Sequence, residues 1–323
     1  MKRALVLSGG GGRGAFQVGM LLELVVERGL DFEVIRGVSV GSVNAAFLAQ
    51  APTGPDSLAN LSERVVALER LWRREIRGNE SVYSKRGGFP GILAGADSLF
   101  SLKPLRALLK KHVSTDALRR SGRDFKVGTV SLVTGRYEEA GPEDPDFFEK
   151  LVASSSIPVV FPFVVLEKAK DVLVDGGVRN ISPIAGALES GADEIYVLLA
   201  SRILRDADDE VPPSAAEPQD FSRWKDGFLG TAVTGFDVLE RTLDLLTDEI
   251  YLNDIRGAIR WMPVDLRVLA PRVWFDESAP PGRRNSSREF DPSLVAAAID
   301  HGREIARDPT LWLWPPPSRG IHR

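Results

Sequence analysis

The stretch Gly37-Val38-Ser39-Val40-Gly41 indicates the fold that the rest of the chain is expected to adopt. It follows a β-branched run at 32–36 and precedes small and apolar residues at 42–49. A strand, a tight turn and a helix are the context in which a G-x-S-x-G sequence forms a nucleophile elbow. Ser39 would then project above a sheet, with a helix N-terminus behind it that favours developing negative charge. The alternative is a small-residue turn with a solvated serine.

The segment before this turn has the pattern of a strand–helix–strand unit. Residues 4–7 are continuously apolar, as expected for a parallel strand buried on both faces. Residues 15–28 have helical spacing, and Gly29 is suited to end that helix. Together with the strand at 32–36, this makes a unit of βαβ size.

The loop Gly9-Gly10-Gly11-Gly12-Arg13-Gly14 has two interpretations. Its Gly9-x-Gly11-x-x-Gly14 spacing fits a dinucleotide-binding fingerprint, which calls for an acidic residue at the end of the second strand. Arg36 stands there instead, a side chain that could suit a 2′-phosphate. Alternatively, the glycine N–H groups form an oxyanion hole. We favour the oxyanion hole, because both glycine motifs follow adjacent strand ends of one unit.

A second candidate for chemistry is Asp175-Gly176-Gly177, which follows the apolar residues 172–174 of a predicted strand that begins at Asp171. Functional residues of open α/β sheets gather at the carboxyl ends of strands, and the two glycines would leave the carboxylate unobstructed. The alternative is a turn aspartate that caps its own backbone.

The chain has only three histidines to serve as a catalytic base, His112, His301 and His322. The order Ser39, Asp175, His301 would match that of a histidine triad. His112 lies in a Lys-Lys-His run that is expected on a solvated face. If no histidine serves, Asp175 must be the base of a Ser39–Asp175 dyad, and its carboxyl, with an ordinary pKa near 4, would need partial desolvation.

Composition limits the partners and the compartment of the protein. The 323 residues are 43% hydrophobic with a net charge of -4, which argues against a nucleic-acid partner. The absence of cysteine excludes disulfides and thiolate chemistry. No signal peptide is recognised, and no stretch approaches the roughly 20 apolar residues of a membrane span. We expect a cytoplasmic protein whose membrane contact, if any, is peripheral.

The other patterns predict three regions: a catalytic domain at 4–200, a linker or mobile loop at 201–220, and a mainly helical region at 221–323 packed on the domain. Either the loop at 77–97 or that at 205–220 could be a lid, and the tail around Trp312 and Trp314 could dock on the body or serve an interface. Oligomeric state is left open. Further strands are expected at 125–133, 136–140, 194–200 and 264–268, and helices at 61–76, 102–118, 147–154, 183–188, 221–259 and 293–306, the last capped by Asp291.

Four motifs in order carry a resemblance to a known family. The loop at 9–14, the turn at 37–41, the stretch Ala153–Pro162 and Asp175-Gly176-Gly177 resemble those of the patatin-like phospholipases of bacterial type. The third motif departs from the family pattern, because Ser156 stands where a small alanine is usual. The resemblance covers residues 4 to about 190.

The resemblance implies a three-layer α/β/α sandwich with a mostly parallel central sheet. It implies lipid acyl hydrolysis, of phospholipase A, lysophospholipase or esterase type, without a metal or cofactor. Acyl transfer by the same residues, nucleotide binding and a catalytically silent binding module are the alternatives. The implied roles are Ser39 as nucleophile, Asp175 as base, Gly10 and Gly11 as main oxyanion donors with Gly12 and Arg13 supporting them, and Gly9, Gly14, Gly37, Gly41, Gly176 and Gly177 as motif glycines.

Overall fold

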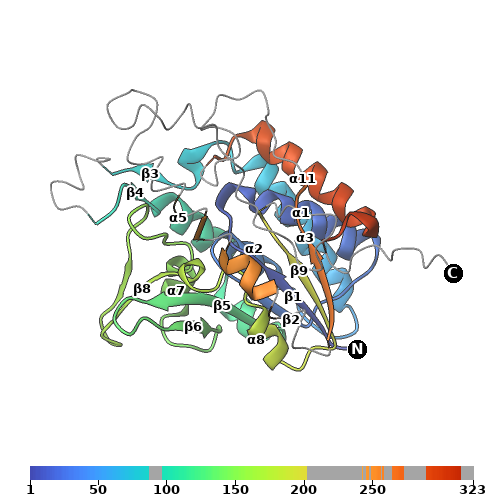
Figure 1. The fold of residues 1–323 in the computed structure, drawn as a ribbon, viewed down its shortest axis with the longest axis horizontal. Helices are drawn as coiled ribbons and strands as arrows, with labels where there is room; N and C mark the ends of the chain where they lie inside the picture. The colour runs from blue at the N-terminus through green and yellow to red at the C-terminus, as the bar shows by residue number, and fades with distance from the viewer. Residues whose placement is uncertain are drawn as a thin grey trace.

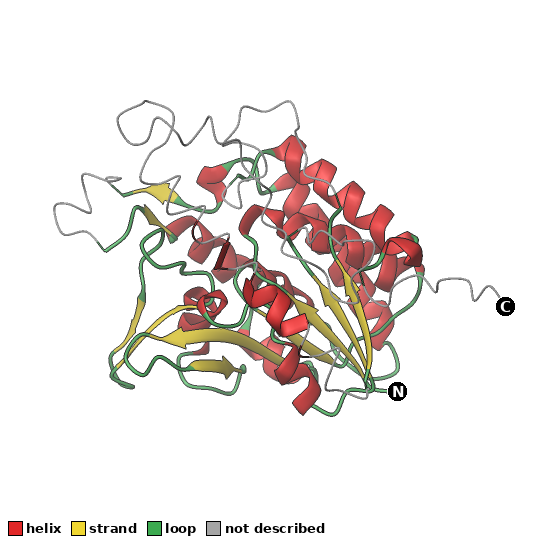
Figure 2. Cartoon of the chain, in the orientation of Figure 1, coloured by secondary structure: helices red, strands yellow, loops and turns green. Residues whose placement is uncertain are grey.

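A mixed sheet of eight strands lies between two layers of helices (Figures 1 and 2). The computed structural model describes residues 1–86, 97–201, 242, 245–246, 249–255, 257, 264–272 and 289–313. The predicted linker at 201–220 lies outside these residues except for Ser201, as do much of the predicted lid at 77–97, most of the predicted helix at 221–259, and Trp314.

The strand order of the sheet is β10-β9-β1-β2-β5-β8-β7, with β6 paired to β5. The first five strands in this order run parallel to one another, and β6, β8 and β7 are attached by antiparallel pairing. A separate ribbon pairs β3 with β4. The strands are β1 Arg3–Leu7, β2 Val34–Gly37, β3 Ser84–Lys85, β4 Phe100–Ser101, β5 Asp124–Ser131, β6 Tyr137–Ala140, β7 Val164–Leu166, β8 Asp171–Asp175, β9 Glu194–Leu198 and β10 Asp265–Leu269.

The described helices follow the predicted segments, with two departures: α3 begins at Ser57 and not at 61, and the first helix changes its type. The first helix is α-helical only to Leu21 and continues as a π-helical segment over Leu22–Glu27. The helices are α1 Gly14–Leu21, α2 Val40–Leu48, α3 Ser57–Arg74, α5 Lys103–His112, α6 Thr115–Arg120, α7 Phe147–Ala153, α8 Ile184–Glu189 and α11 Pro292–Arg307. Short 3-10 turns lie at Gly11–Arg13, Asn79–Ser81, Gly176–Val178 and Pro309–Leu311.

Alternate residues of the central strand β1 face the two helical layers. Leu5 and Leu7 belong to the larger apolar cluster, which includes residues of α1, α2, α3 and α11. Ala4 and Val6 belong to the smaller cluster, with residues of α8 and the helical residues 249–255. Because both faces of the strand are covered, its sequence is a continuous apolar run. This confirms the predicted three-layer sandwich with a mostly parallel sheet.

The C-terminal helix α11 packs directly on the backbone of α1. A Cβ atom at Gly19 of α1 would lie 1.8 Å from the carbonyl oxygen of Ile299, and one at Gly302 of α11 would lie 2.1 Å from that of Phe16. Each helix therefore contributes a glycine that lets the other approach. Among the described residues, the last strand, β10, is thus joined to the body by pairing with β9, and the last α-helix, α11, by packing on α1.

Trp312 docks on the body. Its indole Nε1 donates to the carbonyl oxygen of Ile305 at 3.1 Å, and its ring meets that of Tyr196 edge-on. The side chain is buried, and the next residue, Leu313, donates its N–H to Val268 of β10 at 2.8 Å. The sequence left open whether the tail docks on the body or serves an interface, and the part of it around Trp312 docks on the body.

Strand β7 was not predicted, and the strand predicted at 125–133 is too long. Strand β5 ends at Ser131 because the hydroxyl of that residue accepts the N–H of Thr134 and closes a turn. Strand β7 has only three residues and closely follows Pro162, so the sequence offers little periodicity to recognise. Within the part of the chain that the structure describes, no helix is both long and apolar enough to cross a membrane.

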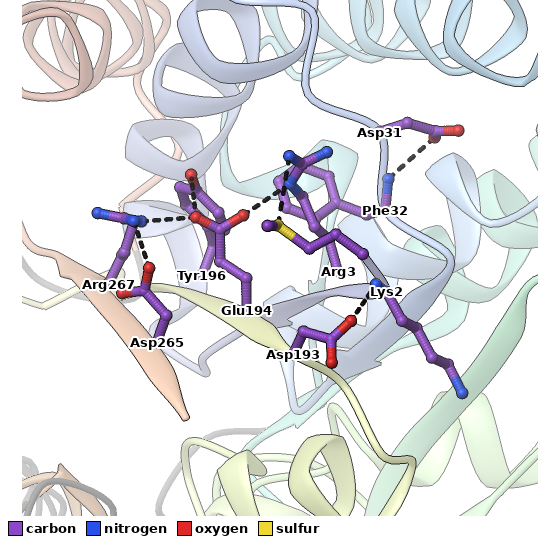
Figure 3. Close-up of polar contacts among 10 residues, drawn as sticks. Lys2, Arg3, Asp31, Phe32, Asp193, Glu194, Tyr196, Asp265 and Arg267 are labelled. Carbon is purple, nitrogen blue, oxygen red and sulfur yellow. Dashed lines mark hydrogen bonds and ion pairs between the residues drawn. The ribbon is translucent and has the colours of Figure 1, made fainter. Parts of the chain in front are cut away.

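An ionic network ties the amino ends of β1, β9 and β10 together (Figure 3). The Glu194 carboxylate accepts from Arg3 Nε at 2.6 Å and from Arg267 Nε at 2.8 Å, and the Tyr196 hydroxyl also donates to it. Burial raises the pKa of Glu194, but the hydrogen bonds from Arg267 and Arg3 outweigh burial and lower the pKa overall. The carboxylate of Glu194, on the middle strand β9, thus links this strand to both of its neighbours, β1 and β10.

We predict that Glu194→Gln lowers the free energy of unfolding by about 1–2 kcal/mol at pH 7, since both partners are partly solvated. Because the pKa of Glu194 is lowered in the folded state, its contribution is present above the ordinary glutamate value and disappears as the pH falls below about 4. Urea unfolding at both pH values measures the difference. Glu138→Gln, an exposed strand position, is the control, and equal losses in the two variants would contradict the prediction.

Candidate active site

Ser39 occupies a strained turn between β2 and α2. Its backbone has φ 55° and ψ −130°, a conformation that is costly for a residue with a side chain. The Ser39 N–H donates to Ser154 Oγ at 3.1 Å, and Ser42 Oγ donates to the Ser39 carbonyl at 2.6 Å. These bonds hold a turn that the chain would not adopt on its own.

The two glycines of the motif permit this turn by removing side-chain atoms from close contacts. A Cβ atom at Gly41 would lie 2.1 Å from the carbonyl oxygen of Leu7, at the end of β1. A Cβ at Gly37 would lie 2.6 Å from the carbonyl oxygen of Gly41. Helix α2 can therefore begin directly on the end of β1 only because these positions lack side chains.

The Gly-rich loop lies against Ser39. A Cβ atom at Gly9 would be 3.1 Å from Ser39 Cβ. Gly10 and Gly11 have φ values of 152° and 57°, and the N–H of Arg13 closes the loop by donating to the Gly10 carbonyl at 3.2 Å. The Arg13 side chain reaches Ser201 Oγ at 3.1 Å, beyond the end of β9. The loop and the serine turn, which follow neighbouring strands, are thus brought together.

Register brings Asp175 to the level of Ser39. Gly37 is paired with Val127 of β5, so Ser39 lies at the level of Thr129, and Thr129 is paired with Asp175 of β8. Strand β8 runs antiparallel to β5. Asp175 is the last residue of β8, so it lies at the carboxyl end of a strand as expected from the sequence, although this strand approaches Ser39 from the direction opposite to that of β2 and β5.

The Asp175 carboxyl is buried and only half satisfied. Its Oδ1 accepts from the N–H of Gly177 at 2.7 Å, while its Oδ2 finds no hydrogen-bond partner of standard geometry among the described residues. Burial raises the pKa of Asp175 to about 7, against the lowering effect of Gly177 and of the Ser39 hydroxyl. Ser39 thus lies close enough to influence this carboxyl, which titrates near neutral pH.

The histidines have different positions. His301 packs edge-on against Phe16, accepts the N–H of Arg272 at 3.2 Å and lies 3.4 Å from Glu304. Burial lowers the pKa of His301. His112, which we expected on a solvated face, instead lines the cavity described below, with its Nε2 at 3.0 Å from Glu75. His322 lies outside the described residues.

Arg36 is not available to a nucleotide. Its side chain is only 2% exposed, and its guanidinium pairs with Asp124 at 2.8 Å and Glu139 at 3.3 Å. The sequence had left open that this arginine could meet a 2′-phosphate. The two carboxylates already occupy the cation, which removes that support for the dinucleotide interpretation of the Gly-rich loop.

An apolar cavity opens from Ser39 between α2, α3 and α5. It contains about 840 Å³ of space unfilled by protein atoms, including the open solvent at its mouth. Its polar lining groups, besides Ser39, include Ser155 and His112. The apolar walls come chiefly from Val43, Phe47, Leu68, Leu71, Trp72, Leu105, Leu109, Phe161 and Phe290.

The serine run at 154–156 does more than permit close packing, the only role that the sequence suggested. Ser154 binds the backbone of the Ser39 turn, as described above. Ser155 lines the cavity, is 8% exposed, and its hydroxyl finds no partner among the described residues. The run follows a helix and lacks a recognisable spacing, so only the tertiary structure reveals these positions.

A buried chain of amides supports the site from below. Gln17 Nε2 donates to the carbonyl oxygens of Ser8 and Leu198, at the ends of β1 and β9. Asn44 Nδ2 donates to Gln17 Oε1 at 3.0 Å and to the Gly14 carbonyl, and Asn44 Oδ1 accepts from Trp72 Nε1 at 2.9 Å. Every amide donor and acceptor of the two side chains is used, and both are fully buried.

A serine at a strained turn between a strand and a helix has the backbone geometry of a nucleophile elbow. The family model described as patatin-like phospholipase matches residues 5–188, more than half of the chain. The chain therefore belongs to the patatin-like phospholipase family, a family of lipid hydrolases.

Two solved structures are similar to this chain at low identity. VipD from Legionella pneumophila has 14% identity and a TM-score of 0.42, over 95% of this chain and 66% of its own. The complex of full-length SpcU with full-length ExoU, from the type III secretion system of Pseudomonas aeruginosa, has 16% identity and a TM-score of 0.29, over 80% of this chain and 53% of its own. The chain thus spans about two thirds of the length of the first of these structures and about half of the length of the second. No curated protein matches the chain.

We predict that Gln17→Leu destabilises the protein by about 2–4 kcal/mol, because a residue of similar size removes one hydrogen bond from each of two strand-end carbonyls and one from the Asn44 amide in the interior. Gln50→Leu is the matched control. The Gln50 amide nitrogen is also buried, but its bonds go to helix carbonyls of α2 and to His112, away from the strand ends. Urea denaturation measures both, and a smaller loss for Gln17→Leu than for Gln50→Leu would contradict the prediction.

Proposed function

We propose that the protein is a serine lipid acyl hydrolase in which Ser39 is the nucleophile and Asp175 the general base. The observation that carries the proposal is the Asp175 carboxyl, which is buried beside Ser39, has a pKa raised to about 7, and has one oxygen without a hydrogen bond of standard geometry from any described residue. A base is most effective when its pKa lies near the working pH. An aspartate needs partial desolvation to act as a base, and burial provides it for Asp175.

In the first half-reaction, Ser39 Oγ attacks the ester carbonyl carbon while its proton passes to Asp175 Oδ2. The negative charge that forms on the carbonyl oxygen is held by the N–H groups of Gly10 and Gly11, in a loop shaped further by Gly12 and Arg13. The carbon–oxygen bond to the alcohol then breaks, and the leaving alcohol takes the proton from Asp175. The acyl group is left as an ester on Ser39.

In the second half-reaction, water gives a proton to Asp175 and attacks the acyl-enzyme. The fatty acid leaves, and Ser39 recovers its proton from Asp175. The apolar cavity, which begins at Ser39, would take the acyl chain, which gives the proposal its substrate class, a lipid ester. An alcohol or thiol in place of water would make the same residues an acyltransferase, so products should be analysed with and without added acceptor.

We predict that Ser39→Ala and Asp175→Asn each lower turnover of a medium-chain p-nitrophenyl ester at least about 1,000-fold, since each removes a member of one catalytic unit. His301→Ala should stay within a few-fold of wild type, because His301 is engaged with Phe16, Arg272 and Glu304. Circular dichroism confirms folding of each variant. An inactive but folded His301→Ala would instead indicate a histidine triad.

We predict that kcat/KM rises with pH through a midpoint near 7 and then levels off. The sign follows from the role of the group, because a base acts only when ionised and burial raises the pKa of Asp175 to about 7. Initial rates in constant-ionic-strength buffers from about pH 5 to about pH 9 provide the measurement. A midpoint near the ordinary aspartate value of about 4 would show that the titrating group is not a desolvated Asp175.

A further inference from the structure

The helical residues 249–255 touch both loops of the proposed site, although they lie outside the region that the family model matches. They form the orange helix that lies over the sheet in Figure 1. Tyr251, Leu252 and Ile255 are almost completely buried and pack with alternate residues of β1 and β9. The segment is therefore anchored on the sheet face opposite to α1 and α11.

Tyr251 binds the Gly-rich loop through its hydroxyl. The hydroxyl donates to the Gly9 carbonyl oxygen at 2.5 Å and lies 2.8 Å from Ser8 Oγ. Ser8 Oγ in turn accepts the N–H of Ala200 at 2.9 Å, just after β9. The phenol is fully buried, so this contact is protected from competing water.

The Gly9 carbonyl matters because it belongs to the same peptide unit as the Gly10 N–H. A trans peptide is planar, and its C=O and N–H point in opposite directions. A bond that fixes the Gly9 oxygen toward Tyr251 therefore fixes the Gly10 N–H on the other side of the loop. A glycine pair has little steric preference to hold that plane, so the hydrogen bonds to the Gly9 carbonyl oxygen hold it, the shorter from Tyr251 at 2.5 Å and the longer from Ser8 Oγ at 3.1 Å.

Asp254, one turn further along the same helical face, binds the loop that follows Asp175. Its Oδ2 accepts from the N–H of Ser182 at 3.4 Å and from the side-chain nitrogen of Asn180 at 3.1 Å, in the amide orientation that satisfies both Asn180 groups. Between these residues, the Ile181 carbonyl accepts the N–H of Gly9 at 3.1 Å. The two loops and the helix thus form a closed ring of hydrogen bonds.

We infer that Tyr251 is a positioning residue, which orients the Gly10 N–H toward the oxyanion, and that Asp254 holds the Asp175 loop in register with it. The inference rests on the proposed function, because it assigns Tyr251 a role in the reaction at Ser39. According to this inference, the proposed activity also depends on residues 249–255, which lie outside the region that the family model matches.

The test is Tyr251→Phe, which removes one oxygen atom. We expect kcat on the p-nitrophenyl ester, and the rate of Ser39 labelling by a fluorophosphonate, to fall about 10- to 100-fold, less than the loss of a whole oxyanion donor. KM should change less than about twofold, because the described lining of the cavity includes no residue of 249–255. When rates are compared at equal concentrations of folded protein, a loss of stability alone would not lower kcat while leaving KM unchanged.

Two further variants complete the experiment. Asn253→Ala, at an exposed position of the same helix whose side chain meets Glu249, should retain wild-type rates. Asp254→Ala should lower kcat as Tyr251→Phe does, while Asp254→Asn, which keeps an acceptor oxygen, should restore most of it. If Tyr251→Phe does not fold, the comparison of the two Asp254 variants tests the inference.

The outcomes separate the inference from the proposed function. Wild-type labelling of a folded Tyr251→Phe, with Ser39→Ala unlabelled, overturns the inference and leaves the Ser39 nucleophile intact. A raised KM with unchanged kcat also overturns it, because that would place Tyr251 in substrate binding. Labelling of Ser39→Ala at the wild-type rate would instead overturn the proposed function, and the inference with it.

Discussion

The contact of Gly41 with the carbonyl oxygens of Leu7 and Ser8 is the constraint on which the proposed site depends. It sets the start of α2 directly on the end of β1, where the Gly-rich loop begins. The serine turn and that loop cannot then be far apart, and a Cβ atom at Gly9 would lie only 3.1 Å from Ser39 Cβ. The spacing between Ser39 and the Gly-rich loop, which we propose as nucleophile and oxyanion donors, is thereby fixed by contacts of the backbone.

The arrangement has a cost in stability. Ser39 has a positive φ, and Asp175 is buried with a pKa raised from an ordinary value near 4 to about 7. A carboxyl group whose pKa is higher in the folded than in the unfolded protein stabilises the fold fully at pH values below its ordinary pKa. That stabilisation is lost as the pH rises to about 7. The fully satisfied amides of Gln17 and Asn44, directly beneath, are suited to offset this cost because they tie both strand ends and three helices together.

Local geometry could be predicted from the sequence, whereas long-range pairing could not. The turn at Ser39, the loop at 9–14 and the Asp291 cap all depend on neighbouring residues, and each was assigned correctly in position. The antiparallel direction of β8, the burial of Arg36 and the cavity position of His112 depend on partners distant in sequence. Tyr251 illustrates the limit, since its helix gives no local sign that its hydroxyl meets Gly9, 242 residues away.

The structure separates the atoms proposed to react from the walls that would select a substrate. Ser39, Asp175 and the Gly-rich loop lie at strands and turns of the sheet, whereas the cavity is lined mainly by α2, α3 and α5 and by Phe290, just before α11. Phe290 stacks near Trp72 and meets Tyr83, so a residue from the C-terminal region closes part of the wall. Side chains on these helices could change the shape of the cavity without moving the serine turn. Acyl-chain preference would then depend on α3, α5 and the C-terminal region, and the chemistry on the strand ends.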